Sequence, residues 1–160
     1  MPGYQGHLAG GTATFFLMYY STTKVLSLPG YNEKELALAF AFCILGSLFP
    51  DIDTKSFGQK IFYFFLAIII LLSIINGHTK LLVPLSLISV FPLLVNHRGI
   101  IHTVWFVTLA PLSIPFVMGY SSPQFTKITW LIYSYFVVGA LSHLLLDYGF
   151  LRLLKRTFGR

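Results

Sequence analysis

The sequence predicts an all-α protein: a polytopic membrane helix bundle that forms one integral membrane domain over residues 1–160. Only 10% of the 160 residues are charged, whereas about 25% is usual for a soluble domain. Hydrophobic residues make up 56% of the chain, and the mean hydropathy is +0.76. A soluble domain this small would expose too much surface for so few charges to cover. Composition therefore excludes a soluble domain, a disordered chain and, with one cysteine, a disulfide scaffold.

Six apolar stretches are candidates to cross the membrane. They cover residues 8–28, 36–49, 61–75, 81–95, 103–118 and 128–148. Several are shorter than the roughly 20 residues that a spanning helix needs, and prolines interrupt the fourth and fifth. We therefore predict about six transmembrane helices, with five or four as alternatives. Residues 149–160 follow the last stretch as a basic cytoplasmic tail.

The distribution of basic residues predicts how the chain is oriented. With six spans, both termini share one side, which holds seven lysines and arginines against four on the other side. The positive-inside rule then predicts a multi-pass membrane protein with both termini in the cytoplasm. The basic tail is typical of a membrane flank in contact with lipids, and we find no direct signature of nucleic-acid binding. Nothing in the sequence indicates an oligomeric state.

Most histidines and acidic residues map to that same side of the membrane. The chain has only five of each. Four histidines and three aspartates fall beside the terminal-side ends of the apolar stretches. These are His7, Asp51, Asp53, His97, His102, His143 and Asp147. Ionisable groups near the bilayer are costly and are retained mainly where they pair or do chemistry, so we predict one shared site at the cytoplasmic ends of the helices.

The local spacings suit metal coordination. His143 and Asp147 are four residues apart and would share one helix face. Asp51 and Asp53 would point the same way if their segment is extended. Imidazoles and carboxylates without a thiolate suit a divalent ion, Zn best, with Mn or Fe as alternatives. Seven ligands exceed the needs of one tetrahedral ion and fit two or more ions joined by a carboxylate.

Each piece also has a simpler interpretation. A histidine near a terminus is often incidental, and an H-x-x-x-D pair on a helix is usually only a side-chain pair. A D-x-D segment after proline is often a turn with capping carboxylates, and H-R-G-x-x-H would be a helix cap in a basic interfacial loop. These interpretations do not explain why the polar side chains converge on one face. His78 falls on the other face, and we interpret it as a solvated loop residue.

The motifs in this order resemble a known family. A histidine near the N-terminus, G-x-L-x-P-D-I-D at 46–53, H-R-G-x-x-H at 97–102 and G-x-x-S-H-L-L-L-D at 139–147 are similar to the YdjM-type inner-membrane metal-dependent hydrolases. That family is more distantly similar to zinc-dependent phospholipases C. The resemblance implies a helical fold, a metal-dependent phosphoester hydrolase site and all seven residues as ligands. Ile101 and Thr103 replace a Thr and a Ser that the family often has, which affects a hydrogen bond around the ligands.

We therefore expect a membrane-embedded hydrolase that cleaves a phosphoester with metal-activated water. Asp53 would act as general base. Arg98 would hold a phosphate oxygen or, equally well, would be a positive charge at the lipid headgroups. A site at the membrane surface favours a phospholipid or another lipid-linked substrate.

Two alternatives to a hydrolase remain. One is a transporter or non-catalytic metal-binding protein, in which His and Asp side chains relay an ion or proton. The other is a scaffold whose metal is structural. Clustering on one face argues against the transporter, because the middles of the apolar stretches offer only Ser, Thr and Tyr.

Overall fold

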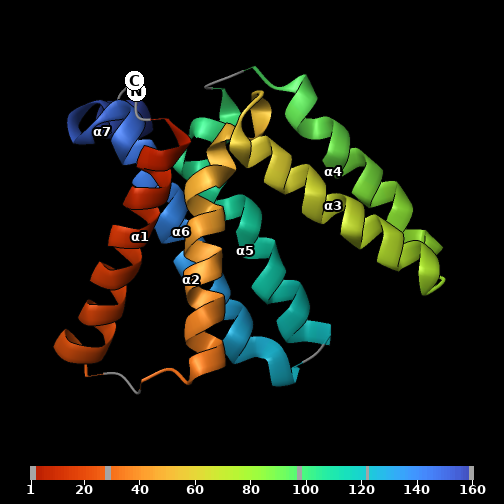
Figure 1. Ribbon diagram of the computed structural model, residues 1–160, viewed down its shortest axis with the longest axis horizontal. Helices are drawn as coiled ribbons and strands as arrows, with labels where there is room; N and C mark the ends of the chain where they lie inside the picture. Colours follow the sequence, from red (N-terminus) through yellow and green to blue (C-terminus); the bar gives the residue numbers. More distant parts are fainter. Residues whose placement is uncertain (1–2, 28–29, 97–98, 122, 159–160) are drawn as a thin grey trace.

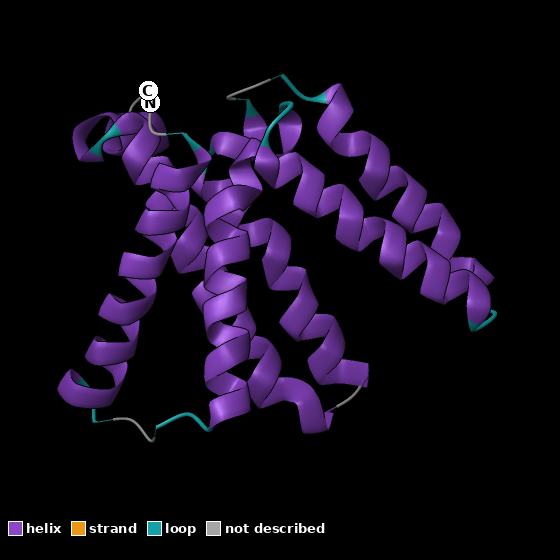
Figure 2. Ribbon diagram, viewed as in Figure 1, coloured by secondary structure: helices purple, strands orange, loops and turns teal. Residues whose placement is uncertain are grey.

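All regular structure in the described part of the chain is helical. The computed structural model describes residues 3–27, 30–96, 99–121 and 123–158 (Figure 1). Its helices are α1 (Tyr4–Tyr20), α2 (Glu33–Leu48), α3 (Phe57–Ile75), α4 (Leu82–Leu94), α5 (Val104–Ser121), α6 (Thr126–Tyr148) and α7 (Phe150–Phe158). A π-helical turn, η1 (Ser21–Val25), and the 3-10 turns η2 (Phe49–Asp53), η3 (Thr79–Leu81), η4 (Ile100–His102) and η5 (Pro123–Phe125) complete the regular structure (Figure 2). The all-α prediction is confirmed.

Each predicted apolar stretch coincides with one of the helices α1 to α6. Among the described residues, three helical segments are long and apolar enough to cross a membrane: Glu33–Asp53, Phe57–Ile75 and Pro123–Tyr148. The apolar segments Thr79–Leu94 and Val104–Tyr120 are shorter. The structure is thus that of a helical membrane protein, while six spans stay a prediction. The predicted tail contains a helix of nine residues, α7, which composition alone did not reveal.

Local sequence explains where α2 and α3 begin. The side chain of Asn32 accepts a hydrogen bond from the backbone N–H of Glu35, whose carboxylate accepts one from the N–H of Asn32. This reciprocal pair satisfies two N–H groups that a helix start leaves open. The hydroxyl of Ser56 does the same for the N–H of Gln59 at the start of α3. Pro50 lies between the two helices, in the tighter turn η2.

The helices α2 and α6 form the centre of the bundle and approach each other backbone to backbone. Gly46 of α2 lies against the carbonyl of Phe136, and Gly139 of α6 lies against the carbonyl of Cys43. A Cβ atom at either glycine would overlap these backbone atoms. Small residues allow such close crossings in membrane bundles, where packing rather than the hydrophobic effect holds helices together. The helix α1 packs against both α2 and α6, and α5 packs against α6.

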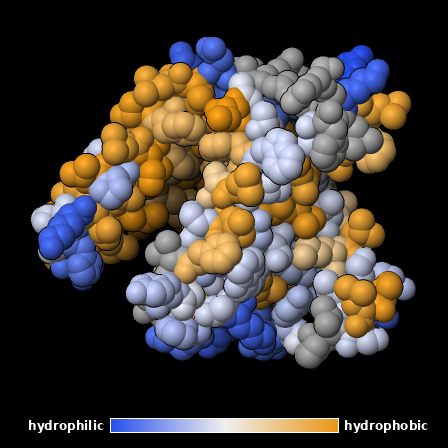
Figure 3. Space-filling view, turned by 180° about the vertical axis from the view of Figure 1, so that it is seen from behind, coloured by the Kyte–Doolittle hydropathy of each residue, from blue (hydrophilic) through white to orange (hydrophobic). Residues whose placement is uncertain are grey.

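The hairpin of α3 and α4 leaves the bundle at the end where η2 lies and diverges from the other helices (Figure 1). The hydroxyl of Tyr63 donates a hydrogen bond to the carbonyl of Ser89 and ties the two helices together. Most large side chains of α3 are exposed, and the hairpin surface is largely hydrophobic in Figure 3. Helices can expose such surface to lipid because their own hydrogen bonds satisfy the backbone.

The crossing of α2 and α6 generates a first prediction. Gly139→Ala should lower the free energy of unfolding by about 1–3 kcal/mol, because the added methyl forces two packed backbones apart. The measurement is the fraction of detergent-solubilised protein that stays monodisperse after stepwise heating. Gly119→Ala is the matched control, since a Cβ there meets only the Thr126 side chain at an ordinary 3.6 Å. Equal stability of both variants would contradict the close crossing.

Candidate metal centre

Four separate segments bring six of the predicted site residues to one end of the bundle. His7 lies in the first turns of α1, His102 ends η4, and the aspartates of the D-x-D motif lie in η2. His143 and Asp147 lie in the last turns of α6. The remaining two predicted residues, His97 and Arg98, lie outside the described residues.

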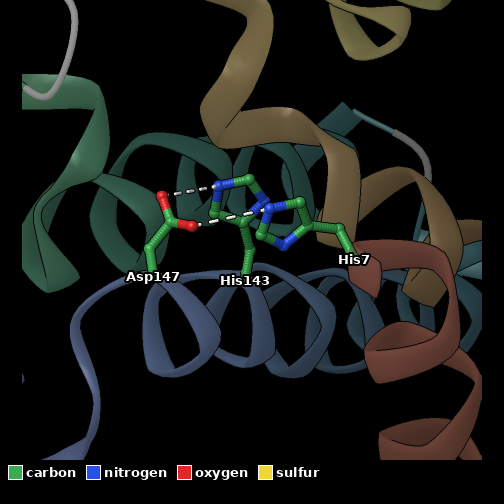
Figure 4. A group of neighbouring side chains, drawn as sticks. All are labelled: His7, His143 and Asp147. Carbon is green, nitrogen blue, oxygen red and sulfur yellow. Dashed lines mark ion pairs between the residues drawn. The ribbon is translucent and has the colours of Figure 1, made fainter. Parts of the chain in front are cut away.

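The first group of side chains is His7, His143 and Asp147, which point toward one another in Figure 4. One oxygen of Asp147, Oδ1, lies 3.5 Å from Nε2 of His7. The other, Oδ2, lies 3.6 Å from Nε2 of His143. The two imidazole rings are stacked, with centroids 3.7 Å apart and planes 14° apart. The two oxygens of this carboxylate therefore face two different histidines.

The second group is Asp51, His102 and His143. Oδ1 of Asp51 lies 3.5 Å from Nε2 of His143 and 3.6 Å from Nε2 of His102. In each group, one donor atom of every residue lies within 4.8 Å of the others. His143 belongs to both groups, so they form one continuous cluster centred on its Nε2 atom.

The spacings of these atoms match donors around a shared ion better than direct hydrogen bonds. Hydrogen bonds of this type are about 2.7–3.2 Å long. Two donors on one tetrahedral zinc ion, with bonds of about 2.1 Å, lie about 3.4 Å apart. The observed separations of 3.5–3.6 Å are close to that second value. Within the described ranges, the buried Nε2 of His143 and Oδ1 of Asp147 also have no hydrogen-bond partner, which a bound ion would explain.

His143 is held in the orientation that a ligand needs. Its Nδ1 atom lies 2.8 Å from the carbonyl oxygen of Ser47, near the end of α2. A carbonyl can only accept, so Nδ1 carries the proton and Nε2 keeps its lone pair for the cluster. Metal-binding histidines commonly have such a partner on the second ring nitrogen. Sequence reasoning missed this partner because it is a backbone atom.

Asp53 occupies a different position from the one predicted. The D-x-D segment is a 3-10 turn rather than an extended segment, so its two carboxylates do not face the same way. Oδ2 of Asp53 lies 3.6 Å from Nδ1 of His102, whereas Asp51 approaches Nε2 of the same ring. Asp53 belongs to neither three-residue group. Its predicted roles as ligand and general base stay predictions.

The cluster is buried, and a cavity lies beside it at His102. The three histidines are at most 2% exposed, and the Asp51 side chain is exposed to 20%. A cavity of about 90 Å³ reaches His102, which leaves room for about three water molecules. Its walls come from η4, the start of α5 and the inner face of α7: His102, Thr103, Val104, Trp105, Leu153 and Thr157.

A comparison with known families identifies the family of this chain. The family model of the YdjM inner membrane protein matches residues 1–150. The chain belongs to the YdjM inner membrane protein family. No curated protein and no solved structure matches it. The match spans all six clustered residues, and membership in the YdjM family agrees with the apolar helices of the fold. The more distant likeness to zinc-dependent phospholipases C stays an expectation.

The cluster generates a second prediction. Protein purified with Zn should contain bound metal, and His143→Ala should lower the metal content more than any other single substitution in the cluster, because both groups share this ligand. Elemental analysis after dialysis is the measurement. His78→Ala is the matched control, because His78 is exposed in the turn between α3 and α4. Metal-free wild-type protein, or an unchanged metal content in His143→Ala, would contradict the centre.

Proposed function

We propose that this protein is a membrane-embedded, metal-dependent hydrolase that cleaves a phosphoester, with a lipid or lipid-linked substrate. The observation that carries the proposal is the cluster around Nε2 of His143, where buried imidazole and carboxylate donors are spaced 3.5–3.6 Å apart. Nitrogen and oxygen donors without a thiolate suit Zn, Mn or Fe. The free thiol, Cys43, donates to the carbonyl of Gly11 within the bundle instead.

Two ions fit the donor set if a carboxylate joins them. Nε2 of His143 has one lone pair and can bind only one ion, although it belongs to both groups. Asp147 is the residue suited to join a second ion, because its two oxygens face His7 and His143 separately. Asp51 and His102 would then be further ligands of the ion that His143 binds.

Divalent ions in such a centre lower the pKa of water to supply hydroxide and offset charge on phosphoryl oxygens. Side chains of the protein would orient the ligands and bind the substrate. Asp53, beside Nδ1 of His102, is suited to hold the proton on that nitrogen and so to fix the ring. To act as general base, its carboxylate would instead have to accept the proton directly from the attacking water. Arg98 would bind a phosphate oxygen. The cavity beside His102 is the route by which water and substrate would enter.

We further propose that the chain crosses the inner membrane six times, with the site at the cytoplasmic side. The support is the excess of basic residues there and the shared end of the bundle at which α1 begins and α7 lies (Figure 1). The α4 and α5 segments are short, but a thinner local bilayer and packing against neighbours accommodate short spans.

The orientation generates a third prediction. A fluorescent protein fused after Arg160 should fluoresce, whereas alkaline phosphatase fused at the same place should be inactive, because both would stay in the cytoplasm. Fusions in the turn at Gly77, on the opposite side, should give the reverse result. An active phosphatase after Arg160 would overturn the proposed orientation.

Hydrolysis generates a fourth prediction. Zn- or Mn-loaded protein should cleave at least one substrate in a panel of phospholipids and phosphodiesters. Asp53→Asn should lower kcat/KM by about 10–100-fold, as expected for a residue that orients a ligand, and His143→Ala should lower it further. His78→Ala should keep full activity. Metal-replete protein that is inert against the whole panel would favour a non-catalytic metal-binding protein, and metal flux into proteoliposomes would favour a transporter.

A further inference from the structure

The helix α7 carries two kinds of side chain on different parts of its surface. Arg152 and Lys155 are exposed and three residues apart, so they are neighbours on one face. Phe150 and Leu151 are 66% and 74% exposed. This is by far the most amphipathic of the helices α1 to α7. A basic face next to an exposed apolar one is the pattern of a helix that lies in the membrane interface.

The position of α7 is set by a turn and by a buried anchor. Gly149 has a φ of +70°, a conformation that favours glycine, and it ends α6 so that α7 turns out of line with it (Figure 1). Leu153 is only 8% exposed and packs in a cluster with Val107 of α5 and Leu144 of α6. The helix is thus fixed to the bundle by its inner face, and its basic and apolar side chains remain available to other molecules.

The inner face of α7 also borders the metal centre. Leu153 and Thr157 form one wall of the cavity that reaches His102. Trp105 lines the same cavity and is 56% exposed. Tryptophan is favoured at the membrane interface because its ring has an apolar body and a polar N–H. The cavity therefore opens beside a helix whose exposed surface suits lipid headgroups.

We propose that α7 lies in the membrane interface and binds the phosphate headgroups of anionic lipids through Arg152 and Lys155, beside the opening to His102. Charge complementarity selects this partner, because residues 148–160 contain basic side chains and no acidic one. Exposed Phe150 and Leu151 would enter the acyl region while the cations stay at the phosphates. Resting on the proposed function, the substrate class is then an anionic phospholipid, brought to the centre by this helix.

The test uses Trp105 as a reporter of nearby lipid. The chain has two tryptophans, so Trp130→Phe leaves Trp105 alone at the cavity. This protein is placed in vesicles of phosphatidylcholine and phosphatidylglycerol in equal amounts, with bromine on the acyl chains of one lipid or the other. Brominated phosphatidylglycerol should quench Trp105 more strongly than brominated phosphatidylcholine, and added salt should reduce the difference.

Paired charge variants identify the source of the preference. Arg152→Gln with Lys155→Gln should abolish the difference in quenching, and both side chains are exposed, so the fold should be retained. Lys24→Gln with Lys34→Gln removes the same charge at the other end of the bundle from exposed positions, and it should leave the difference intact. Equal quenching by the two lipids in the Trp130→Phe protein, or a difference that survives the α7 variant, would overturn the proposal.

The outcome does not depend on catalysis, since quenching needs neither metal nor turnover. A protein that is inert as a hydrolase but prefers brominated phosphatidylglycerol would keep the lipid-binding helix and lose the substrate assignment. A working hydrolase without this preference would keep the proposed function and lose the role of α7.

Discussion

The hydrogen bond from Nδ1 of His143 to the carbonyl of Ser47 joins the packing of the bundle to the chemistry of the site. It forms because α2 and α6 touch backbone to backbone at Gly46 and Gly139, one residue and four residues away along the two helices. The same contact therefore sets the distance between the helices, the tautomer of the ring and the direction of Nε2. The distances in both ligand groups depend on that direction.

The cluster needs positive charge to offset its carboxylates. Three aspartate side chains lie within a few ångströms of the buried histidines, and two of the three are at most 5% exposed. Burying a carboxylate costs several kcal/mol unless it is paired. Protons on the histidines would meet part of this cost, but then Nε2 of His143 would be a donor facing two acceptors at 3.5–3.6 Å, which is too long for good hydrogen bonds. A divalent cation would satisfy both the charge and the distances.

The helices and most of the cluster follow from the sequence by simple reasoning. Apolar stretches become helices because a backbone in lipid must satisfy its own hydrogen bonds. Successive helices run in alternating directions, so every second connection lies at the same end of the bundle (Figure 1). His7, His102 and Asp147 therefore meet there although they are far apart in the chain. The first glycines of the G-x-L-x-P-D-I-D and G-x-x-S-H-L-L-L-D motifs lie at the crossing of α2 and α6, which the sequence analysis did not predict.

Other features depend on backbone geometry that residue types do not reveal. With about three residues per turn, side chains two apart on a 3-10 turn point about 120° away from each other, so Asp51 and Asp53 approach different nitrogens of His102. An extended segment would have aligned them. The helix α7 was missed because its composition resembles a basic flank, and only its helical periodicity separates the two faces. The role of Ser47 was missed because its carbonyl, not its hydroxyl, meets His143.

The first group of side chains comes from the two helices α1 and α6, which lie near opposite ends of the sequence. This has a consequence for how the protein assembles. The chain is synthesised from its N-terminus onward, so α1 with His7 is made long before His143 and Asp147. Until α6 packs against α1 and α2, His7 has neither its stacking partner nor the carboxylate beside it. Assembly of the centre is therefore a late event in biogenesis, and a chain truncated before α6 would lack the residue around which both ligand groups are built.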